Sequence, residues 1–532
     1  MSPLFNSTAI ATSIVPAFVP SPQQAVIFDW ILNGAGNLVC RAVAGAGKTT
    51  LLIQALIRMS GTVGLFSFSK DIVTELQARV SQLDSAHSSK ATIGTMHAVG
   101  FGAIRGIHPR VKVEGKGWKE KKAYIIAENL NIPEDLRNFV ANAVSKAKNI
   151  GIGVVLPFGD KQAWLDMVDH FDLADLLPED RSVPLADALR FACLALKESV
   201  AMAANLIDFD DMIYLPGLKG LPLTQYDWLL IDEAQDINVM RLAMIGMMLK
   251  PNGRLIAVGD DAQAIFGFTG ADADALNRIQ TDFNAISLPL SVSYRCAQSI
   301  VAEAQRYMPG IEAHPAAPMG TVKTLNEADF YATLAPFLSA SDAVLCRNTK
   351  PLVSLAYGLL GRGIGCRIEG KDIGSGLKRL ANKWRRVKTI GALHDRLDSY
   401  LESETKKAAE KGHDYKIESV TDKVGCLKVI MQSLHDDDKI IALDNKIDSM
   451  FGDTRPGETP NVLTLSTIHK AKGREWHRVI WLGRNLYQPS KYARQPWQIQ
   501  QETNLCYVAT TRAKSELIIV DVAAPDRACP AA

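Results

Sequence analysis

Short apolar runs recur along the chain, and apolar residues at helical spacing lie between many of them, as in Thr49–Met59 and Val239–Leu249. A strand that is buried on both faces of a parallel sheet is a continuous apolar run. The alternation of such runs with helices therefore predicts an α/β fold built on parallel sheets. The predicted strands are Leu38–Cys40, Val63–Phe68, Trp228–Ile231, Leu255–Val258, Ala343–Cys346, Val462–Leu465, Val479–Leu482 and Leu517–Val520.

Two long stretches lack these strand signals. The first runs from about Phe101 to Asn205 and has Ala, Lys and Leu at helical spacing; the second runs from about Gly374 to Pro460. The second opens with Gly-Ser-Gly and closes with Pro-Gly-Glu-Thr-Pro, and such breakers are typical of the ends of an inserted domain. We expect a flexible tail at 1–20, a first lobe at 21–100 and 206–285, a helical insertion at 101–205, a second lobe at 286–373 and 461–532, and a short helical insertion at 374–460.

Composition narrows the class of protein. The 532 residues, 47% hydrophobic and 22% charged, exclude disordered, collagen-like and coiled-coil classes and predict three to four domains at roughly 150 residues each. A net charge of +2 excludes a bulk polycation, so any nucleic-acid surface must be local. The eight cysteines form no CxxC pair, which disfavours a disulfide scaffold or zinc finger.

The sequence also bears on location. No apolar run of about 20 residues predicts a membrane span, and no basic segment at the N-terminus predicts a signal peptide. We therefore expect a protein of the cytoplasm that contacts no membrane. It would be associated with the nucleoid if it is bacterial, and would lie in the host cytoplasm if it is viral.

A predicted strand runs into a glycine-rich turn that a helix follows, which is the setting of a phosphate-binding P-loop. The backbone amides of the turn and the helix N-terminus would face the phosphates, Lys48 would reach the β and γ phosphates, and the Thr49 hydroxyl would bind Mg²⁺. Ala42 stands where the strict pattern has its first glycine. The alternative is a chance glycine-rich turn. The candidate nucleotide-binding residues are Ala44, Gly45, Ala46, Gly47, Lys48, Thr49 and Thr50.

Two adjacent carboxylates end another predicted strand. Ligands bind at the carboxyl ends of strands in α/β sheets, so Asp232 suits Mg²⁺ and Glu233 suits a general base that polarises water. A third strand ends before Gln263, which could bind the γ-phosphate or the attacking water; solvated glutamine is the alternative. Paired with Lys48, the acidic motif predicts a nucleoside triphosphatase that uses ATP and Mg²⁺.

Further motifs follow in a fixed order. They are DEAQD at 232–236, VGDDAQAIFGFTGA at 258–271, LSTIHKAKGREW at 465–476 and YVATTRA at 507–513. With these motifs the chain resembles superfamily 1A DNA helicases of the UvrD/Rep/PcrA type, over both lobes. The resemblance implies an α/β fold of two RecA-like P-loop lobes with parallel sheets, each interrupted by a mostly helical insertion.

The resemblance also implies roles around the nucleotide. Gln24 would read the adenine edge, with Gln23 as the alternative, and Tyr294 would stack on adenine. Glu475 would approach the ribose. Thr50 and Ser293 stand where relatives often carry Arg and Asn.

Two arginines far along the chain, Arg295 and Arg512, would reach the γ-phosphate by the same resemblance. They lie far from Lys48 in sequence. If both neutralise charge on the γ-phosphate, the nucleotide lies in a cleft between the lobes, and hydrolysis opens it. The alternative for either arginine is a surface salt bridge.

Single-stranded nucleic acid is held by phosphate contacts and by aromatic stacking. Phe268 stands where relatives carry Trp, so we expect it to stack on a base. Phe68 and Phe266 could instead pack in a core, and His97 and His469 could be structural. Basic clusters at 116–122 and 378–388 could meet phosphates or be solvated helix faces. The candidate DNA-binding residues are Phe68, Ser69, Lys70, Thr95, His97, Phe266, Phe268, Thr467 and His469.

The leading hypothesis is an ATP-dependent helicase or translocase on single-stranded DNA, with 3′→5′ movement implied by the resemblance. A DNA-stimulated ATPase that remodels protein–DNA complexes in repair or recombination is the alternative. A nucleotide-binding module without turnover is a third, which the intact catalytic residues argue against. Expected partners are single-stranded DNA, junctions with duplex, and proteins of repair, recombination or replication, with the chain itself a monomer. No residue is seen to read the 2′ position, so the preference for DNA over RNA rests on resemblance.

Overall fold

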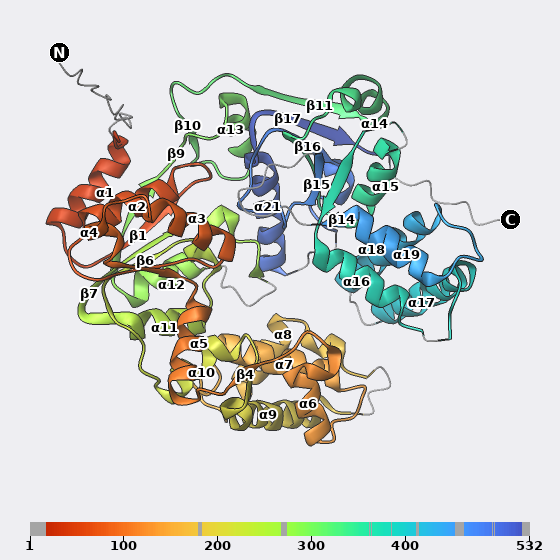
Figure 1. Ribbon diagram of the computed structural model, residues 1–532, viewed down its shortest axis with the longest axis horizontal. Coiled ribbons are helices and arrows are strands. Elements are labelled where there is room, and N and C mark those ends of the chain that lie inside the picture. The colour runs from red at the N-terminus through yellow and green to blue at the C-terminus, as the bar shows by residue number, and fades with distance from the viewer. Residues whose placement is uncertain are drawn as a thin grey trace, which may run out of the picture.

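The computed structural model describes residues 18–523, apart from 179–182, 268–273, 361, 363, 385, 411–413, 453–461, 492 and 494. Most of the predicted tail, and Phe268, lie outside the described residues. Two parallel sheets form the centres of two lobes, and helical segments extend below the first and beside the second (Figure 1). The prediction of an α/β fold with two parallel-sheet lobes is confirmed.

Lobe 1 is built on a six-stranded sheet in the order β3-β2-β6-β7-β1-β8, with every pair parallel. The last strand pairs with β1 along its full length, so lobe 1 extends to Leu290 and the predicted start of lobe 2 at 286 is wrong. The strands are β1 Asn37–Ala42, β2 Val63–Phe66, β3 Ala91–Gly94, β6 Tyr226–Ile231, β7 Leu249–Gly259 and β8 Ala285–Leu290. The helices are α1 Pro22–Asn33, α2 Lys48–Arg58, α3 Lys70–Val80, α4 Ser85–Ser88, α11 Val239–Met248 and α12 Ala275–Asp282.

Between β3 and β6 the chain forms a helical segment, which we call insertion 1. Its first and last helices cross closely at Gly100, where an added Cβ would lie 1.7 Å from the carbonyl oxygen of Met212. Its helices extend past both predicted ends, 101 and 205, and share one apolar core with a face of the lobe 1 sheet. The elements are α5 Met96–Ile107, β4 Lys112–Val113, α6 Lys122–Asn129, α7 Arg137–Ile150, α8 Lys161–His170, α9 Leu185–Ala201, β5 Leu206–Ile207 and α10 Asp211–Lys219.

Lobe 2 is built on a seven-stranded parallel sheet in the order β11-β17-β16-β12-β15-β13-β14. Its strands are β11 Thr321–Asn326, β12 Asp342–Cys346, β13 Cys366–Glu369, β14 Phe451–Gly452, β15 Leu463–Thr467, β16 Trp476–Leu482 and β17 Ala513–Asp521, and a small pair joins β9 Val292–Ser293 to β10 Glu312–Ala313. The helices are α13 Gln298–Ala304, α14 Glu327–Asp329, α15 Thr349–Leu360, α20 Arg484–Tyr487 and α21 Pro496–Thr511. In Figure 1, α21 runs down the middle of the molecule, between the lobes.

The second helical segment, insertion 2, consists of α16 Lys371–Ala381, α17 Ile390–Glu410, α18 Asp414–Met431 and α19 Ile440–Met450. The expectation that Gly374 and Gly376 act as breakers at the start of the insertion is wrong, because both lie inside α16. An added Cβ on Gly374 would lie 3.0 Å from the Cβ of Phe451, so the glycine lets α16 pack closely there. The predicted closing breaker at 456–460 lies outside the described residues. Insertion 2 shares an apolar core with the lobe 2 sheet, as an added layer.

Within the described part of the chain, no helix is both long enough and apolar enough to span a bilayer. Seven cysteines are described there, and all are free.

Candidate nucleotide site and strand-binding surface

The P-loop connects β1 to α2 and is held in a shape that depends on glycine. Gly45 and Gly47 have φ of +75° and +82°, in the left-handed region. An added Cβ on Gly45 would lie 2.4 Å from the Cβ of Arg295, and the Tyr294 amide donates to the Gly45 carbonyl at 2.9 Å. The loop of lobe 1 is therefore in direct contact with the segment that carries the predicted γ-phosphate arginine.

Lys48 and Glu233 form a partly buried ion pair with 3.1 Å between Nζ and Oε1. β6 ends at Ile231, so its carboxyl end delivers both acidic residues to the P-loop side of the sheet. Glu233 has φ +53°, a strained backbone for a non-glycine residue, and such strain is typical of functional sites. Gln235 donates to its other carboxylate oxygen at 2.5 Å, so the Glu233 side chain is fixed by two partners.

The two neighbouring carboxylates differ in charge. Burial, and then the charge of Glu233, raises the pKa of Asp232 to about 7. Burial also acts to raise the pKa of Glu233, but the charges of Lys48 and Lys472 outweigh it and lower the pKa to about 2. Glu233 is therefore the carboxylate that is ionised throughout the neutral range.

The residues fit a bound Mg²⁺ that brings water and phosphate ligands of its own. Among the described residues no cluster of three metal-ligating side chains exists, so a cage made only of protein is absent from that part of the chain. Mg²⁺ bound together with phosphates needs only one or two protein ligands. The buried carboxyl of Asp232 and the hydroxyl of Thr49, in the first turn of α2, supply that donor chemistry.

Gln263 of lobe 1 and Arg512 of lobe 2 meet where the two lobes are in contact. The Arg512 guanidinium donates to Gln263 Oε1 at 3.3 Å, and Gln263 Nε2 donates to Asp260 Oδ2 at 2.6 Å. Burial, and then the charge of Arg295, lowers the pKa of Arg512 to about 10, which leaves it cationic at neutral pH. Arg512, Gln263 and Asp260 thus form one chain of hydrogen bonds, and contact of Arg512 or Gln263 with a γ-phosphate stays a prediction.

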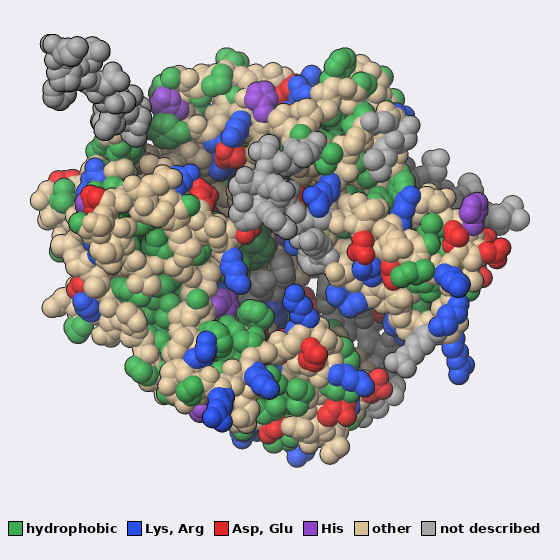
Figure 2. Space-filling view, viewed as in Figure 1, with side chains coloured by type: hydrophobic (Ala, Val, Ile, Leu, Met, Phe, Trp, Pro, Cys, Tyr) green, Lys and Arg blue, Asp and Glu red, His purple; other side chains and the backbone are tan. Residues whose placement is uncertain are grey.

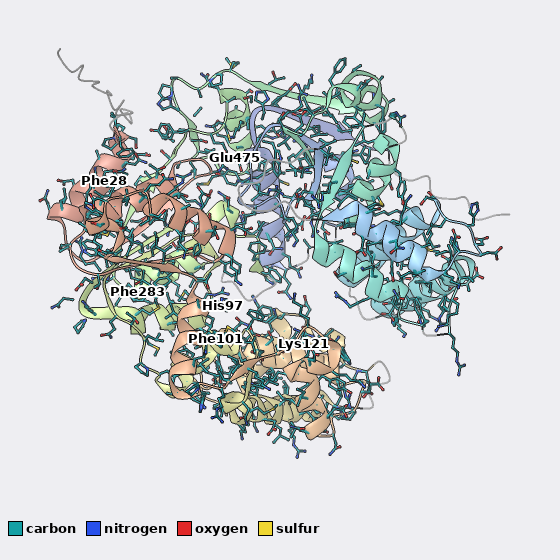
Figure 3. All side chains as sticks on the ribbon, viewed as in Figure 1. Phe28, His97, Phe101, Lys121, Phe283 and Glu475 are labelled. Atoms are coloured by element: carbon teal, nitrogen blue, oxygen red, sulfur yellow. The ribbon has the colours of Figure 1, made fainter. Side chains whose placement is uncertain are left out.

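Glu475, the residue predicted to approach the ribose, is held by two cations. Its carboxylate oxygens lie 2.5 Å from Arg295 Nε and 2.7 Å from Lys514 Nζ. Figure 3 places Glu475 between the two lobes. A role at the ribose stays a prediction, and the structure adds that Glu475 orients Arg295.

The two predicted adenine-reading glutamines have different surroundings. Gln23 exchanges two hydrogen bonds with Ser291, at 2.8 and 2.9 Å, which ties it to the chain that follows β8. Gln24 is buried, forms a capping box with Ser21, and has Nε2 3.4 Å from the place of an added Cβ on Gly47. Gln24 is therefore the glutamine that lies at the P-loop.

Tyr294, predicted to stack on adenine, keeps 49% of its surface exposed. Its ring lies beside that of His314, with 4.7 Å between centroids. A ring that is exposed next to the P-loop suits base stacking. Thr50 lies in the first turn of α2, and its contact with a nucleotide stays a prediction.

Phe68 and Phe266 stack on each other between the P-loop side of lobe 1 and lobe 2, with 6.1 Å between centroids and 18° between planes. Phe68 is 39% exposed, so the core-packing alternative is wrong for it. Phe266 packs partly against the core. The Arg241 guanidinium lies 4.6 Å from the Phe68 ring centre and Lys472 Nζ lies 4.8 Å from that of Phe266.

The polar residues predicted to contact DNA cap local structure. Ser69 Oγ accepts from Asp71 N at the start of α3, which begins at Lys70, and Thr95 Oγ accepts from Ala98 N at the start of α5. Thr467 Oγ1 accepts from the Lys470 amide at 3.4 Å, in the turn that follows β15. These capping bonds do not test contact with DNA, which stays a prediction for Ser69, Lys70, Thr95 and Thr467.

The two predicted histidines are both neutral at pH 7. Burial lowers the pKa of His97 to about 4, aided by Arg241 and Lys70, and burial lowers that of His469 to about 3, aided by Arg347 and Lys472. The His97 ring lies 6.5 Å from the exposed ring of Phe209. Figure 3 shows His97 where insertion 1 joins lobe 1.

The sequence motifs at 465–476 and 507–513 contain Lys472 and Tyr507, and their pattern assigns no role to either residue. Lys472 Nζ donates to Asp236 at 2.7 and 3.0 Å and to the Gln263 carbonyl at 2.7 Å. The buried Tyr507 hydroxyl accepts from the Ala44 amide at 2.9 Å and donates to Asp260 at 3.3 Å. Both side chains come from lobe 2 and bind lobe 1. Their partners lie far away in the sequence, so the sequence pattern does not reveal these contacts.

The basic cluster at 116–122 separates into exposed and buried parts. Trp118 is 71% exposed, and Lys121, labelled in Figure 3, pairs with Glu114. Lys122 and Lys148 are instead buried with two carboxylates, Asp208 and Asp211, in an ionic cluster inside insertion 1. In the cluster at 378–388, Trp384 packs against the Tyr400 ring and Lys378 pairs with Asp448, as a solvated helix face would.

Comparison with known proteins gives two separate family matches. The UvrD/REP helicase N-terminal domain model matches residues 27–284, and the UvrD-like helicase C-terminal domain model matches residues 371–523. The chain is 26% identical to the ATP-dependent DNA helicase Rep of Escherichia coli (strain K12) over 309 residues, which is 54% of this chain and 42% of that protein. It is 25% identical to DNA helicase IV of the same organism over 371 residues, 61% of this chain and 52% of that protein. It is 22% identical to the ATP-dependent DNA helicase PcrA of Leuconostoc citreum over 291 residues, 50% and 36% of the two chains. The chain thus spans about half, or less than half, of the length of the curated relatives that it matches.

Proposed function

The chain belongs to the UvrD/Rep-type family of DNA helicases, and from that premise we propose that it is an ATP-dependent helicase or translocase that moves 3′→5′ on single-stranded DNA. The observation that carries the proposal is the convergence of charged groups from both lobes on one cleft. Lys48 and Glu233 come from lobe 1, and Arg295 and Arg512 come from lobe 2. Such a cleft couples the γ-phosphate to the distance between the lobes.

Each residue then has a role in hydrolysis. Lys48 leaves Glu233 for the β and γ phosphates, and the freed Glu233 carboxylate, whose pKa the charge of Lys472 still lowers, accepts a hydrogen bond from the attacking water. Arg295 and Arg512 stabilise the negative charge that spreads over the transferred phosphoryl oxygens. Bound Mg²⁺, held by Thr49 and Asp232, would neutralise the β and γ phosphates.

The contacts of Asp236, the last residue of the DEAQD motif, support coupling of ATP hydrolysis to a bound strand. Lys472 binds the Asp236 carboxylate and lies over Phe266, while Arg241 donates to the Asp236 carbonyl at 3.0 Å and lies over Phe68. A shift of Asp236 after hydrolysis would move both cations and with them the stacked pair of rings. This pair is where the proposal places bases of the strand.

The test combines ATP hydrolysis with strand displacement. We expect single-stranded DNA to stimulate hydrolysis, and a duplex with a 3′ tail, but not one with a 5′ tail, to be separated. Glu233→Gln should bind ATP and lose about 10²–10⁴-fold in kcat, whereas the exposed Glu134→Gln should retain activity. Displacement from a 5′ tail alone would contradict the polarity, and DNA-stimulated hydrolysis without displacement would favour a remodelling ATPase.

A further inference from the structure

Helix α1 has the predicted adenine-reading glutamine at one end and a set of unpaired helix carbonyls at the other. It begins at Pro22 and ends at Asn33, so Gln24 lies in its first turn and Trp30 and Ile31 lie in its last. The structure describes all of α1, and the last turn of this helix contains no basic residue. The last carbonyl groups of a helix have no partner within the helix, and a nearby cation stabilises them. At this end of α1 the cation has to come from another element.

Arg254 of β7 supplies that cation. Its guanidinium donates to the carbonyl oxygens of Trp30 and Ile31 at 3.3 and 3.2 Å, and to that of Gly36 at 3.1 Å. It also lies over two indole rings, 4.1 Å from the centre of Trp30 and 4.4 Å from that of Trp228 on β6. A planar guanidinium can stack on a ring and donate several directed hydrogen bonds at the same time, which an ammonium group cannot. These contacts, which we call the α1 clamp, tie the end of α1 to the two central strands of the lobe 1 sheet.

Helix α1 is a rigid connection between the clamp and Gln24. The helix contains no glycine, and its one proline is the first residue, so its interior has no residue that favours a bend. Ile27 and Phe28, in the middle of the helix, are buried in the core of lobe 1, where Figure 3 labels Phe28. At about 1.5 Å per residue, Gln24 and Ile31 are roughly 10 Å apart along the helix axis. A tilt of the last turn about the buried middle therefore displaces Gln24 in the opposite direction.

The first turn of α1 fixes which atoms of Gln24 lie at the P-loop. Ser21 Oγ accepts from the Gln24 amide, and the Ser21 amide donates to Gln24 Oε1, both at 3.1 Å. Gln24 Nε2 lies 3.4 Å from the place of an added Cβ on Gly47. A carboxamide held in this way offers the Nε2 donor together with the second lone pair of Oε1. Adenine presents an acceptor beside a donor, which fits such an amide, whereas guanine presents two acceptors at the same edge. The amide can distinguish the two bases only while α1 holds it in place.

We propose that Arg254 is a positioning residue for base selection, which holds α1 so that Gln24 pairs with adenine and disfavours guanine. The inference rests on the proposed function, because it concerns the choice of nucleotide in the same cleft. Arg254 lies at the opposite end of α1 from Gln24, so it acts through the helix and not on the nucleotide. It precedes the motif at 258–271, and no sequence motif marks it.

The α1 clamp is also separate from the surface that the proposed function assigns to the strand. Figure 2 shows a hollow where the lobes and insertion 1 meet, whereas α1 lies at the outer edge of lobe 1 (Figure 1). A change at Arg254 should therefore alter the choice of nucleotide and leave the binding of single-stranded DNA unchanged.

The experiment measures kcat and KM of the full chain for ATP and for GTP, with oligo-dT present. The wild type should prefer ATP. Arg254→Lys keeps the charge but loses the planar fork, so KM for ATP should rise and the ATP-to-GTP ratio of kcat/KM should fall about tenfold, while kcat for ATP stays unchanged. The matched control is Arg105→Lys, because Arg105 also lies in the last turn of a helix, α5, with its guanidinium 5.7 Å from the centre of the Phe101 ring. This control should keep the wild-type ratio.

Two further measurements separate positioning from a purely stabilising role. A clamp that only stabilised the fold would lower kcat/KM for both nucleotides together and leave their ratio unchanged. In the double variant of Gln24→Ala with Arg254→Lys, the ratio should equal that of Gln24→Ala alone, because the clamp acts through Gln24. Arg254→Lys should also bind fluorescent oligo-dT like the wild type.

A wild type without preference for ATP, an unchanged ratio in Arg254→Lys, a further fall of the ratio in the double variant, or a matching loss of oligo-dT affinity would overturn the inference. Binding of fluorescent ATP and GTP analogues gives the same ratio without turnover. A chain whose ATP hydrolysis does not respond to oligo-dT would overturn the proposed function, and the ratio of analogue affinities would still test Arg254.

Discussion

Replacing Tyr507 with phenylalanine removes one hydroxyl from the contact between the lobes. That hydroxyl accepts from the Ala44 amide in the P-loop and donates to Asp260 Oδ2. The side chain is fully buried, so water does not take the place of the lost group. Asp260 keeps its 2.6 Å bond from Gln263, whereas the Ala44 amide loses this acceptor.

The size of the effect follows from the lost bonds. A buried donor left without an acceptor costs about 1–3 kcal/mol, and we take about 2 kcal/mol for the substitution. The cost falls on the arrangement in which lobe 2 contacts the P-loop, and the proposed function requires that arrangement to bring Arg295 and Arg512 to the nucleotide. Since 1.4 kcal/mol is a factor of ten, the apparent affinity for ATP should fall by up to roughly thirtyfold.

A second buried tyrosine provides the control. Tyr214 in α10 is also fully buried, and its hydroxyl donates to the Ile152 carbonyl at 2.6 Å, inside insertion 1. Tyr214→Phe should lower the free energy of unfolding and leave ATP affinity unchanged. The assay is titration with a fluorescent ATP analogue, together with denaturant unfolding of each variant. If Tyr507→Phe binds the analogue like the wild type, or if Tyr214→Phe weakens it equally, the reasoning is refuted.

Three further predictions concern packing and charge. Gly100→Ala should destabilise the fold by about 1–3 kcal/mol, because the added Cβ would meet a carbonyl oxygen of α10. The control Gly102→Ala, whose added Cβ has no atom within 4 Å, should stabilise the fold by about 0.5–1 kcal/mol. Equal effects of the two variants in denaturant unfolding would count against the close crossing of α5 and α10. Lys148→Met should cost about 3–5 kcal/mol in the same assay because it leaves two buried aspartates with one cation fewer, and a loss no larger than that of the exposed Lys161→Met would contradict the ionic cluster. Burial lowers the pKa of His97 to about 4, below the ordinary value of 6.5, so the unfolded chain binds its proton first and the free energy of unfolding should fall as pH drops from about 6.5 to about 4. His97→Gln should reduce that fall, and an unchanged pH slope would speak against it.

The sequence predicts best those strands that are buried on both faces. Runs such as Leu229–Ile231 and Val479–Leu482 are continuous and apolar because helices or insertions cover both sides of the sheet. The edge strands β3 and β11 escaped prediction because exposed positions interrupt them. Strand β8 contains Pro289, and half of its residues are exposed, so the sequence pattern did not predict it as a strand. For this reason the predicted boundary between the lobes was also misplaced.

The nucleotide site divides in a similar way between local and distant information. The P-loop and the acidic pair are local motifs, so their residue types and spacing predict them. The contacts of Tyr507 and Lys472 join segments far apart in the chain, and only the folded structure brings those segments together. Phe171 and Trp497 line one groove between insertion 1 and lobe 2, although they lie in separate elements without a shared pattern. The prediction at Gly374 is wrong because glycine is favoured both where a helix ends and where a helix packs closely against another element.

The proposed function is tested by the rate of ATP hydrolysis of the full chain with and without single-stranded oligo-dT, measured beside Lys48→Ala. We expect that the oligonucleotide raises kcat of the wild type and that Lys48→Ala, which lacks the cation for the β and γ phosphates, shows no hydrolysis in either condition. A wild-type rate that oligo-dT does not change would contradict the central claim that one cleft couples the nucleotide to a strand.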